Sequence, residues 1–395
     1  MRISRTQAEG IIQVLKETLM QDRYADKALE KVFRVNRELK ANDRGIIAEA
    51  SYDIIRYWRL LQVVSGSQSL WKILGAWLVL TGEKIPAWKE TSSINEKSVQ
   101  ATRQQAITTR AIRESIPDWL DELGVNALGE QWEKELHALN QSPKTCLRVN
   151  TLKTSREELK TLLTNEGINT YTDEAFPDAL LLQENLPVFQ TSAFQDGLFE
   201  VQDAASQCVA PFLQPKAGQR VIDACAGTGG KTLHVASLMN NKGRLLGMDV
   251  AEWRLEELRK RARRAGVHNM ETRVIDSVKT IRKLNGTADC LLLDVPCSGL
   301  GVLKRNPDAK WKLKPDYINK LITIQQQLLR DYAWMTKPGG ILVYSTCSIL
   351  PAENHDQVAA FMNAHPNAFE IIEEKSLLPS QGFDGFYMAR LKRLV

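Results

Sequence analysis

The feature that most limits the possible folds of this chain is the alternation of short apolar runs with amphipathic segments from Gln207 onward. The apolar runs predict buried strands, and the segments between them predict helices. Strands that alternate with helices indicate a parallel sheet with crossover helices, so we expect an α/β fold with a doubly wound sheet. The strands are expected at residues 220–224, 244–249, 271–275, 288–294 and 340–345, and the main helices at residues 252–265 and 315–335.

The chain before this region divides into two parts. The first 140 residues predict helices, one of which has Asn42 as its N-cap and carries Ile47, Ile54 and Trp58 along one face. Short strands expected at 145–150, 179–182 and 197–201, with a helix at 155–166, indicate a small α/β segment. We therefore expect an all-helical domain at residues 1–140, a small α/β subdomain at 141–205 and the sheet domain at 206–395.

Within the helical region, residues 91–105 are polar and predict a mobile connection, and residues 119–139 predict a further helical stretch. No internal repeat or low-complexity tract interrupts the chain. The region is therefore expected to pack as one helical domain.

Composition excludes several classes of protein. With 43% hydrophobic and 25% charged residues, the chain is neither disordered nor fibrous. Its six cysteines form no Cys-x-x-Cys pair, so no metal site is predicted. The first ten residues lack the apolar core of a signal peptide, and the most apolar run, at 70–80, is too short to span a bilayer. We expect a cytoplasmic protein with reduced thiols.

The turn after the first strand of the sheet, Asp223-Ala-Cys-Ala-Gly227-Thr-Gly-Gly-Lys-Thr232, is rich in small residues. Such a turn lets a ligand approach the backbone at the start of the following helix. It matches neither of two common nucleotide motifs. A P-loop needs glycine where this chain has Cys225, and the dinucleotide motif begun at Gly227 needs glycine at Thr232.

Three acidic residues follow successive strands of the expected sheet, namely Asp249, Asp276 and Asp294. The carboxyl ends of parallel strands meet at one edge, where open α/β sheets bind ligands. The alternative is that each aspartate caps the helix or turn that follows it. S-Adenosylmethionine suits three carboxylates in one crevice, because it has ribose hydroxyls and a cationic amino-acid tail. Asp249 is placed to accept hydrogen bonds from those hydroxyls.

Two cysteines are expected at the same edge, Cys297 in Asp-Val-Pro-Cys-Ser-Gly and Cys347 in Tyr-Ser-Thr-Cys-Ser. A single cysteine is usually a small buried hydrophobic residue. Two at corresponding strand ends, flanked by Pro, Ser and Gly, favour chemistry instead. The cysteines that lack this setting, and are expected to pack rather than react, are Cys146, Cys208, Cys225 and Cys290.

A thiol gives a methyltransferase access to a weakly nucleophilic carbon. Addition of a thiolate to carbon 6 of a pyrimidine makes carbon 5 enamine-like, able to attack a sulfonium methyl group, and loss of the carbon-5 proton then expels the thiolate. The attacking cysteine needs a lowered pKa or a nearby base, and Asp294 could hold the N3/N4 edge of the pyrimidine. DNA cytosine methyltransferases attack with a Pro-Cys cysteine, so spacing alone leaves both Cys297 and Cys347 open.

The glycine turn, the Pro-Cys segment at 294–299 and the Thr-Cys segment at 346–348 resemble motifs of the RNA cytosine-5 methyltransferases. Within that family the chain is most similar to the RsmB/Sun/Fmu type, whose members act on bacterial small-subunit ribosomal RNA. The resemblance covers about residues 115–395 and implies a class I methyltransferase fold of the Rossmann-like type. It continues in Leu147-Arg-Val-Asn150, Val201-Gln-Asp203, Arg305-Asn-Pro-Asp308, Pro351-Ala-Glu-Asn354 and Asp384-Gly-Phe-Tyr387.

By this resemblance, Cys347 is the covalent nucleophile, Cys297 assists resolution of the adduct, and Asp294 lies near the target base. The implied cofactor is S-adenosyl-L-methionine, with Asp249 at its ribose and Asp276 near its adenine. The turn departs from the family's usual Ala-Pro-Gly-Gly-Lys in having Gly-Thr-Gly-Gly-Lys. The residues implied to bind the cofactor are Ala224, Cys225, Ala226, Gly227, Thr228, Gly229, Gly230, Lys231, Asp249, Asp276 and Asp294.

Two basic segments are candidates for RNA contact. Residues 251–286 carry ten Lys and Arg against five acidic residues, which fits either RNA contact or a solvated helix face. The second segment surrounds Trp311 soon after the Pro-Cys segment, where basic residues beside an aromatic ring suit phosphate contact and base stacking. The residues predicted to contact RNA are Arg148, Lys304, Arg305, Lys310 and Trp311.

The N-terminal helices resemble the NusB-like RNA-binding domain of this subfamily, and residues 141–205 resemble an RNA-recognition module. The leading hypothesis is a monomeric, S-adenosylmethionine-dependent enzyme that methylates carbon 5 of a cytosine in small-subunit ribosomal RNA. The same chemistry on tRNA is one alternative. A non-catalytic ribosome-assembly factor is another, and the two cysteines and three aspartates argue against it.

Overall fold

A computed structural model describes residues 3–395 of the chain. The chain forms two compact units, which we call the helical unit (Met1–Gln141 with Leu303–Pro315) and the sheet unit (Ser142–Val302 with Asp316–Val395). The sequence placed residues 303–315 in the sheet domain, whereas they pack with the helices. It also separated residues 141–205 from the large sheet, whereas the structure holds residues 142–205 and the large sheet in one unit.

The helical unit consists of amphipathic helices around one apolar core, as the sequence predicts. Ile11, Leu15, Ile47, Ile54 and Leu74 are fully buried in this core. Its helices are α1 Arg5–Leu19, α2 Ala25–Val35, α3 Ala41–Arg56, α4 Trp58–Ser65, α5 Leu70–Leu80, α6 Glu96–Ala106, α7 Arg110–Arg113, α8 Asp118–Leu128, α9 Gln131–Leu139 and α17 Ala309–Lys312.

Helix boundaries in this unit differ from the sequence prediction at three places. The helix predicted to follow Asn42 begins at Ala41, after Lys40, and α4 starts afresh beyond Tyr57. Much of the polar segment predicted as a connection is helix α6, because Asn95 caps it by accepting a hydrogen bond from the backbone N of Ser98 (3.1 Å). Gly129, with φ of +56°, separates α8 from α9. Caps and one glycine set these boundaries, which apolar periodicity does not mark.

The most apolar run of the chain forms α5, in which Ile73, Leu74 and Leu78 are fully buried. Within residues 3–395, no single helix has both the length and the apolar composition of a bilayer span. Helices α4 and α5 meet that criterion only when taken together, and the break between them bends by 98°.

The sheet unit begins with a small antiparallel sheet of strand order β2-β3-β1-β4. Its helix α10 starts with a capping box, in which Ser155 and Glu158 each accept a hydrogen bond from the backbone N of the other (3.2 and 2.9 Å). The elements are β1 Cys146–Val149, α10 Arg156–Asn165, β2 Thr170–Tyr171, β3 Ala179–Leu182, α11 Ser192–Gln195 and β4 Phe199–Val201.

The large sheet has seven strands in the order β10-β11-β9-β8-β5-β6-β7, of which β9, β8, β5, β6 and β7 run parallel. The chain starts in the middle at β5, proceeds outward to β7 and then returns to β8. The order therefore reverses between β5 and β8, which confirms the predicted doubly wound, class I methyltransferase fold. The strands are β5 Arg220–Asp223, β6 Arg244–Asp249, β7 Met270–Val274, β8 Ala288–Asp294, β9 Thr336–Thr346, β10 Phe369–Leu377 and β11 Phe386–Arg393.

The antiparallel strands β10 and β11 extend this sheet, and the sequence did not predict them. Strand β10 is exposed from Glu370 to Ser376, so it carries no apolar alternation. Strand β9 also starts earlier than predicted, since it runs through the Lys337-Pro-Gly-Gly340 segment that predicts a turn. A register shift opposite Ala288 and Cys290 accommodates the irregular start.

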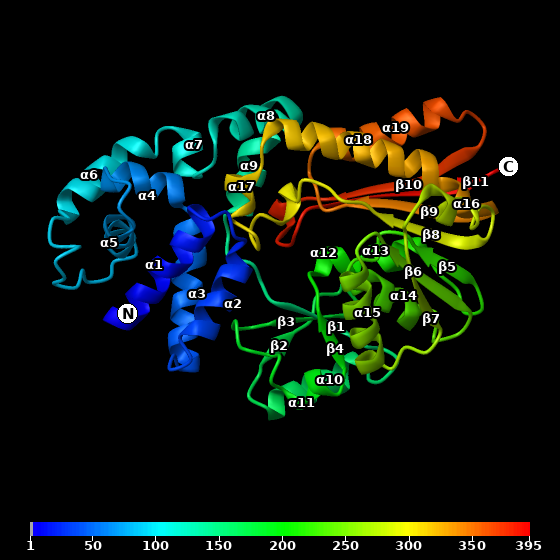
Figure 1. Ribbon diagram of the computed structural model, residues 1–395, viewed down its shortest axis with the longest axis horizontal. Helices are drawn as coiled ribbons and strands as arrows, with labels where there is room; N and C mark the ends of the chain where they lie inside the picture. The colour runs from blue at the N-terminus through cyan, green and yellow to red at the C-terminus, as the bar shows by residue number, and fades with distance from the viewer. Residues whose placement is uncertain (1–2) are drawn as a thin grey trace. The chain divides into compact units, whose positions relative to one another are not determined.

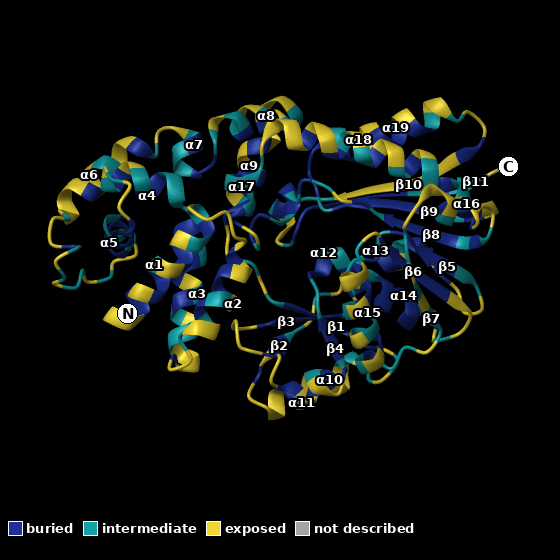
Figure 2. Cartoon of the chain, in the orientation of Figure 1, coloured by how far each residue is buried: buried dark blue, intermediate teal, exposed yellow. Residues whose placement is uncertain are grey.

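Helices cover both faces of the large sheet (Figure 1). Leu329 of α18 and Phe361 of α19 pack on one face, and Val209 of α13 and Val235 of α14 pack on the other. The strands between them are largely buried (Figure 2). The remaining helices are α12 Ala204–Gln207, α13 Val209–Leu213, α14 Gly230–Leu238, α15 Glu252–Ala265, α16 Val278–Arg282, α18 Pro315–Tyr332 and α19 His355–Ala364.

Candidate active site

The glycine loop joins β5 to α14 at the carboxyl edge of the parallel strands. Gly227 and Gly229 have φ of +53° and +94°, values that side chains rarely adopt. A Cβ at Gly229 would lie 2.1 Å from Leu258 Cδ1, whereas a Cβ at Gly227 would have no atom within 4 Å. The loop therefore packs against α15 at Gly229 and leaves space beside Gly227, near the unpaired first N–H groups of α14.

Asp249, at the end of β6, holds this loop. Its Oδ2 accepts a hydrogen bond from the backbone N of Gly227 (3.0 Å), and its Oδ1 accepts one from Ala251 N (2.9 Å). The side chain is buried. Because each carboxylate oxygen has two lone pairs, Asp249 keeps acceptor capacity for a ligand hydroxyl beside Gly227.

Asp276 follows β7 and is exposed at the same edge. It accepts hydrogen bonds from Thr280 Oγ1 and from Ser277 Oγ (3.0 Å), and these bonds hold its pKa below the usual value. Both bonds come from side-chain hydroxyls and not from backbone N–H groups, so Asp276 does not cap α16. The exposed carboxylate also leaves acceptor positions open.

Asp294, at the end of β8, forms a half-buried ion pair with Lys231 from the first turn of α14. Lys231 Nζ lies 2.7 Å from Asp294 Oδ2, and Ser345 Oγ donates to Asp294 Oδ1 at 2.9 Å. Burial lowers the pKa of Lys231, but Asp294 outweighs it and the pKa is raised, with a smaller contribution from Cys347. Lys231 therefore stays charged and lies close enough to Cys347 to interact with it.

Cys297 and Cys347 lie side by side, with their sulfur atoms 3.2 Å apart. Both side chains are half-buried. The hydrogen bond to Cys347, burial and the charge of Glu353 together raise the pKa of Cys297 well above its usual value. These surroundings hold Cys297 in its protonated form, and the spacing of the two motifs did not reveal that the two sulfur atoms touch.

The other four cysteines have the surroundings of packed residues. Cys146 and Cys290 are buried, and burial raises the pKa of Cys290 to about 12 and that of Cys208 to about 11. Burial also raises the pKa of Cys225, in the glycine loop, well above its usual value. Because the thiolate is the reactive form, these environments disfavour nucleophilic chemistry.

Arg148, predicted to contact RNA, instead supports the glycine loop. Its side chain is 3% exposed and donates to the carbonyl oxygen of Gly230 and to Gln202 Oε1. Burial lowers its pKa to about 10. The guanidinium of Arg148 thus braces the start of α14 and offers little surface to a phosphate.

The residues predicted to bind RNA around Trp311 lie in the helical unit. Lys310 is 1% exposed, and its Nζ donates to Arg56 O (2.8 Å) and Asn140 Oδ1 (3.1 Å). Trp311 Nε1 donates to Ile55 O (2.8 Å). Lys304 is 3% exposed, whereas Arg305 and Trp311 are half-buried and keep partial access to solvent. The Lys310 ammonium is thus bonded and buried, which disfavours the predicted contact with phosphate.

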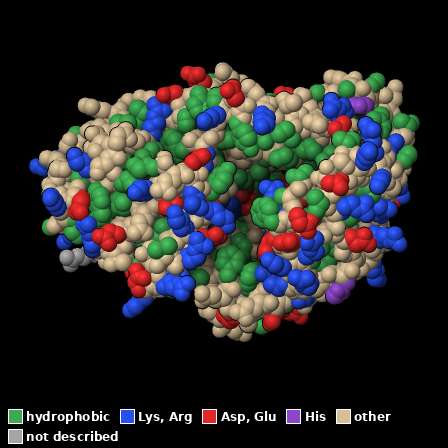
Figure 3. Space-filling model, viewed as in Figure 1, with side chains coloured by type: hydrophobic (Ala, Val, Ile, Leu, Met, Phe, Trp, Pro, Cys, Tyr) green, Lys and Arg blue, Asp and Glu red, His purple; other side chains and the backbone are tan. Residues whose placement is uncertain are grey.

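The basic residues of α15 favour the solvated-face alternative. Five of its six Lys and Arg side chains form ion pairs: Arg254 with Asp249, Arg259 with Glu252, Lys260 with Glu257, and both Arg261 and Arg264 with Glu200. On the face of the molecule seen in Figure 3, Lys and Arg side chains likewise lie among Asp and Glu side chains. The excess positive charge of this segment is thus largely neutralised locally.

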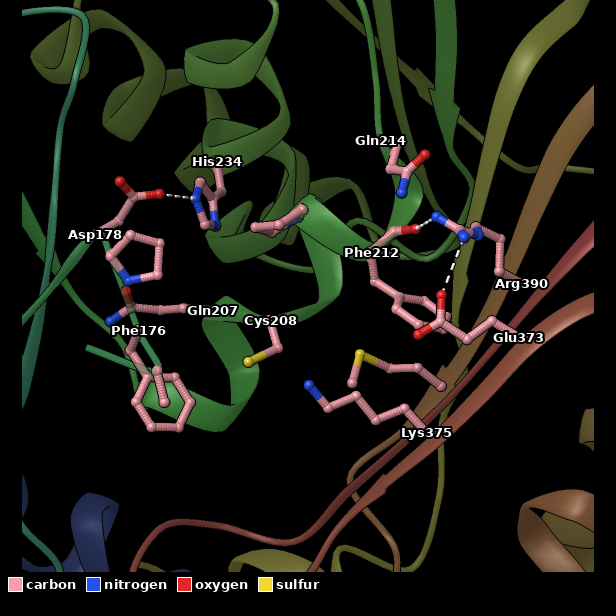
Figure 4. Close-up of a pocket in the computed structure, with 14 residues that line it drawn as sticks. Phe176, Asp178, Gln207, Cys208, Phe212, Gln214, His234, Glu373, Lys375 and Arg390 are labelled. Carbon is pink, nitrogen blue, oxygen red and sulfur yellow. Dashed lines mark hydrogen bonds and ion pairs between the residues drawn. The ribbon is translucent and has the colours of Figure 1, made fainter. Parts of the chain in front are cut away.

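A separate cavity of about 280 Å³ lies in the sheet unit (Figure 4). None of the residues predicted to bind the cofactor lines it. Most of its charged groups pair with one another: His234 Nε2 lies 2.9 Å from Asp178 Oδ2, and Arg390 lies 3.0 Å from Glu373. Burial lowers the pKa of His234 to about 4. The cavity is therefore neither the predicted cofactor site nor a strongly charged one.

Sequence reasoning missed two buried acids at the site. Asp223 is 1% exposed and accepts a hydrogen bond from Thr232 Oγ1 (2.7 Å), and burial raises its pKa to about 7. Glu353 is fully buried and bonds to both cysteine segments. Both residues lie within motifs identified in the sequence. Their burial sets them apart from the other acidic residues of those motifs, and the motifs do not encode burial.

The geometry agrees with comparisons to known proteins. A family model described as 16S rRNA methyltransferase RsmB/F matches residues 210–392, and a model of the RsmF/B-like ferredoxin-like domain matches residues 116–189. A probable ribosomal RNA small subunit methyltransferase B from Synechocystis is 37% identical over 298 residues, which cover 71% of this chain and 67% of the relative. The chain belongs to the RsmB/F family of 16S rRNA methyltransferases.

Members of the RsmB/F family are S-adenosylmethionine-dependent RNA cytosine-5 methyltransferases, so the resemblance inferred from the sequence motifs is confirmed. Ribosomal RNA small subunit methyltransferase B from Proteus mirabilis is 35% identical over 277 residues, which cover 70% of this chain and 65% of the relative. The chain thus spans about two thirds of the length of these relatives. The crystal structure of PH0851 is 25% identical and covers 100% of both chains with a TM-score of 0.83.

Proposed function

We propose that this protein methylates carbon 5 of a cytosine in small-subunit ribosomal RNA through a covalent bond between Cys347 and carbon 6. The observation that carries the proposal is the grouping of two touching thiols with the Lys231–Asp294 ion pair at the ligand-binding edge of the sheet. Membership of the RsmB/F family supports the substrate. We expect the protein to act in the cytoplasm, where that RNA is assembled.

The residues of the edge fit S-adenosylmethionine. Asp249 has acceptor capacity for ribose hydroxyls, Gly227 leaves the loop open, and Asp276 and Asp294 offer carboxylates to adenine and to the cationic amino-acid tail. The loop residues Ala224, Cys225, Ala226, Thr228 and Gly230 would supply backbone contacts. When bound, the cofactor supplies an electrophilic methyl group.

The chain's own groups would then divide the remaining work. Cys347 forms the bond to carbon 6, and the charge of Lys231 favours its thiolate. Asp294 accepts from the N4 edge of the cytosine, which must leave any base stack to reach the pocket. The adduct resolves when the carbon-5 proton passes to water and the carbon–sulfur bond breaks, which releases Cys347 as a thiolate. Cys297, whose raised pKa keeps it protonated, donates a hydrogen bond to that departing sulfur.

Substitution of each cysteine tests this division. We expect Cys347→Ala to abolish methyl transfer, and Cys297→Ala to accumulate a protein–RNA adduct that denaturing gels resolve. Cys208→Ala, which removes a thiol outside the site, is the matched control and should form product normally. Full activity of Cys347→Ala would contradict the proposal. Bisulfite mapping of ribosomal RNA from cells with and without the protein identifies the cytosine.

A further inference from the structure

Glu353 is an unusual residue for the interior of the sheet unit. Its side chain is fully buried, yet no ion pair with Lys, Arg or His involves it within residues 3–395. A buried carboxylate without a cation is costly unless several donors surround it. We therefore looked for the hydrogen-bond donors that surround the Glu353 carboxylate and for the segments they belong to.

Four hydrogen-bond donors converge on the Glu353 carboxylate. Its Oε1 accepts from the backbone N of Ser298 (2.8 Å) and from Gln325 Nε2 (3.0 Å). Its Oε2 accepts from the hydroxyls of Ser298 and Ser348, both at 2.5 Å. An ionised carboxylate, which only accepts, satisfies all four.

The two serines occupy equivalent places in the two cysteine segments. Ser298 directly follows Cys297, and Ser348 directly follows Cys347. Each hydroxyl also accepts from the backbone N two residues later, Leu300 N at 3.3 Å and Leu350 N at 3.1 Å. The two segments are thus built alike and share one carboxylate oxygen.

Gln325 of α18 fixes the other side of the Pro-Cys segment. It is fully buried, and its Nε2 donates to Pro296 O (2.9 Å) as well as to Glu353. Cys297 therefore lies between two residues, Pro296 and Ser298, that are both tied to the Glu353–Gln325 pair.

We propose that Glu353 is a positioning residue that sets the contact between the Cys297 and Cys347 sulfur atoms. Each sulfur belongs to the residue next to a serine that Glu353 holds, so loosening either bond lets one thiol move relative to the other. The catalytic meaning of this contact rests on the proposed function. The geometry itself is measurable without RNA.

Disulfide formation measures the thiol contact directly. Hydrogen peroxide takes two electrons and two protons from the Cys297 and Cys347 thiols, leaving one sulfur–sulfur bond and two molecules of water. We expect this cross-link, quantified by mass spectrometry, to form about ten-fold more slowly in Glu353→Gln than in the natural protein, since small misplacements cost large factors in rate. Ser298→Ala and Ser348→Ala should each lower the rate of cross-linking by a smaller factor. Ser51→Ala, which removes a fully buried hydroxyl in the helical unit, should show none.

The partition between adduct and product provides the second readout. If Cys297 is displaced, Glu353→Gln should accumulate the protein–RNA adduct, as we expect for Cys297→Ala, while its thermal unfolding and cofactor affinity remain close to those of the natural protein. Unchanged cross-linking in a folded Glu353→Gln protein would overturn the proposal. If Glu353→Gln does not fold, Ser298→Ala and Ser348→Ala provide the test, and unchanged cross-linking in both folded variants would overturn the proposal. If no variant forms an adduct but cross-linking slows, the positioning role stands and the proposed covalent chemistry fails.

Discussion

Lys231 and Lys310 both stand in motifs that predict function, yet the structure gives them opposite roles. Lys231 lies at the edge of the sheet, where Asp294 raises its pKa and keeps its ammonium charged beside Cys347. Lys310 is buried in the helical unit, bonds to the neutral oxygens of Arg56 and Asn140, and has a pKa that burial lowers well below the usual value. The type of partner therefore decides whether the pKa of an enclosed lysine is raised or lowered.

Loss of Lys231 should have the largest effect on activity. Lys231→Met removes the positive charge near Cys347 and the hydrogen bond to Asp294 Oδ2, while Ser345 Oγ still donates to Asp294 Oδ1. We expect the single-turnover rate of methyl transfer to fall about 10²–10³-fold, the range for loss of one preorganised charged donor. Thermal unfolding serves as the control for folding. A rate within about ten-fold of the natural protein would show that the contrast with Lys310 has no catalytic meaning.

Asp223, a buried acid at the carboxyl edge of the sheet, also has a pKa that its surroundings change, as Lys231 and Lys310 do. Its pKa is about 7 in the folded state against an ordinary value of 3.8, so between these values the folded state binds more protons than the unfolded chain. Stability from this group is therefore present at low pH and lost as pH rises through 7. We expect the free energy of unfolding to fall between pH 5 and pH 8, and Asp223→Asn to flatten that dependence. Denaturant titrations at pH 5 and pH 8 measure the free energy of unfolding. An equal change between these pH values in the natural protein and in Asp223→Asn would contradict the raised pKa of Asp223.

Lys310 should affect stability rather than RNA binding. Lys310→Met removes the buried donor to the Arg56 and Asn140 oxygens, so we expect the free energy of unfolding to fall by about 1–3 kcal/mol. A lysine that contacts phosphate also contributes about one unit to the salt dependence of RNA binding. We expect that slope to be unchanged in Lys310→Met. A decrease of about one unit would restore the sequence prediction of phosphate contact.

The smallest effect is expected at Arg263, the exposed basic residue of α15 for which no ion pair is found within residues 3–395. Arg263→Ala should change the free energy of unfolding by less than about 0.5 kcal/mol. Arg261→Ala should cost more, since Arg261 bonds to Glu200 (2.8 Å) and to Thr228 O (2.9 Å). Denaturation of the two variants side by side tests whether local pairing gives this helix face its structural role.

The alternation of apolar runs with amphipathic segments made the parallel strands of the large sheet predictable. Segments without this pattern were not predicted. Strands β6 and β8 have the predicted bounds, because their residues are apolar and buried. Strand β10 went unpredicted because its exposed residues carry no such pattern. Residues 303–315 were assigned to the wrong neighbours, because their contacts with the helices join residues more than two hundred positions apart.

The sequence by itself determined the family, the parallel sheet and the identity of the residues at its carboxyl edge, because glycine turns, strand periodicity and the two cysteine motifs are local patterns. Only the tertiary structure decided that the Cys297 and Cys347 sulfur atoms touch, that Glu353 ties the two cysteine segments together, and that Lys310 is buried. These features depend on burial and on partners distant in the chain. Both arise only when the chain has folded.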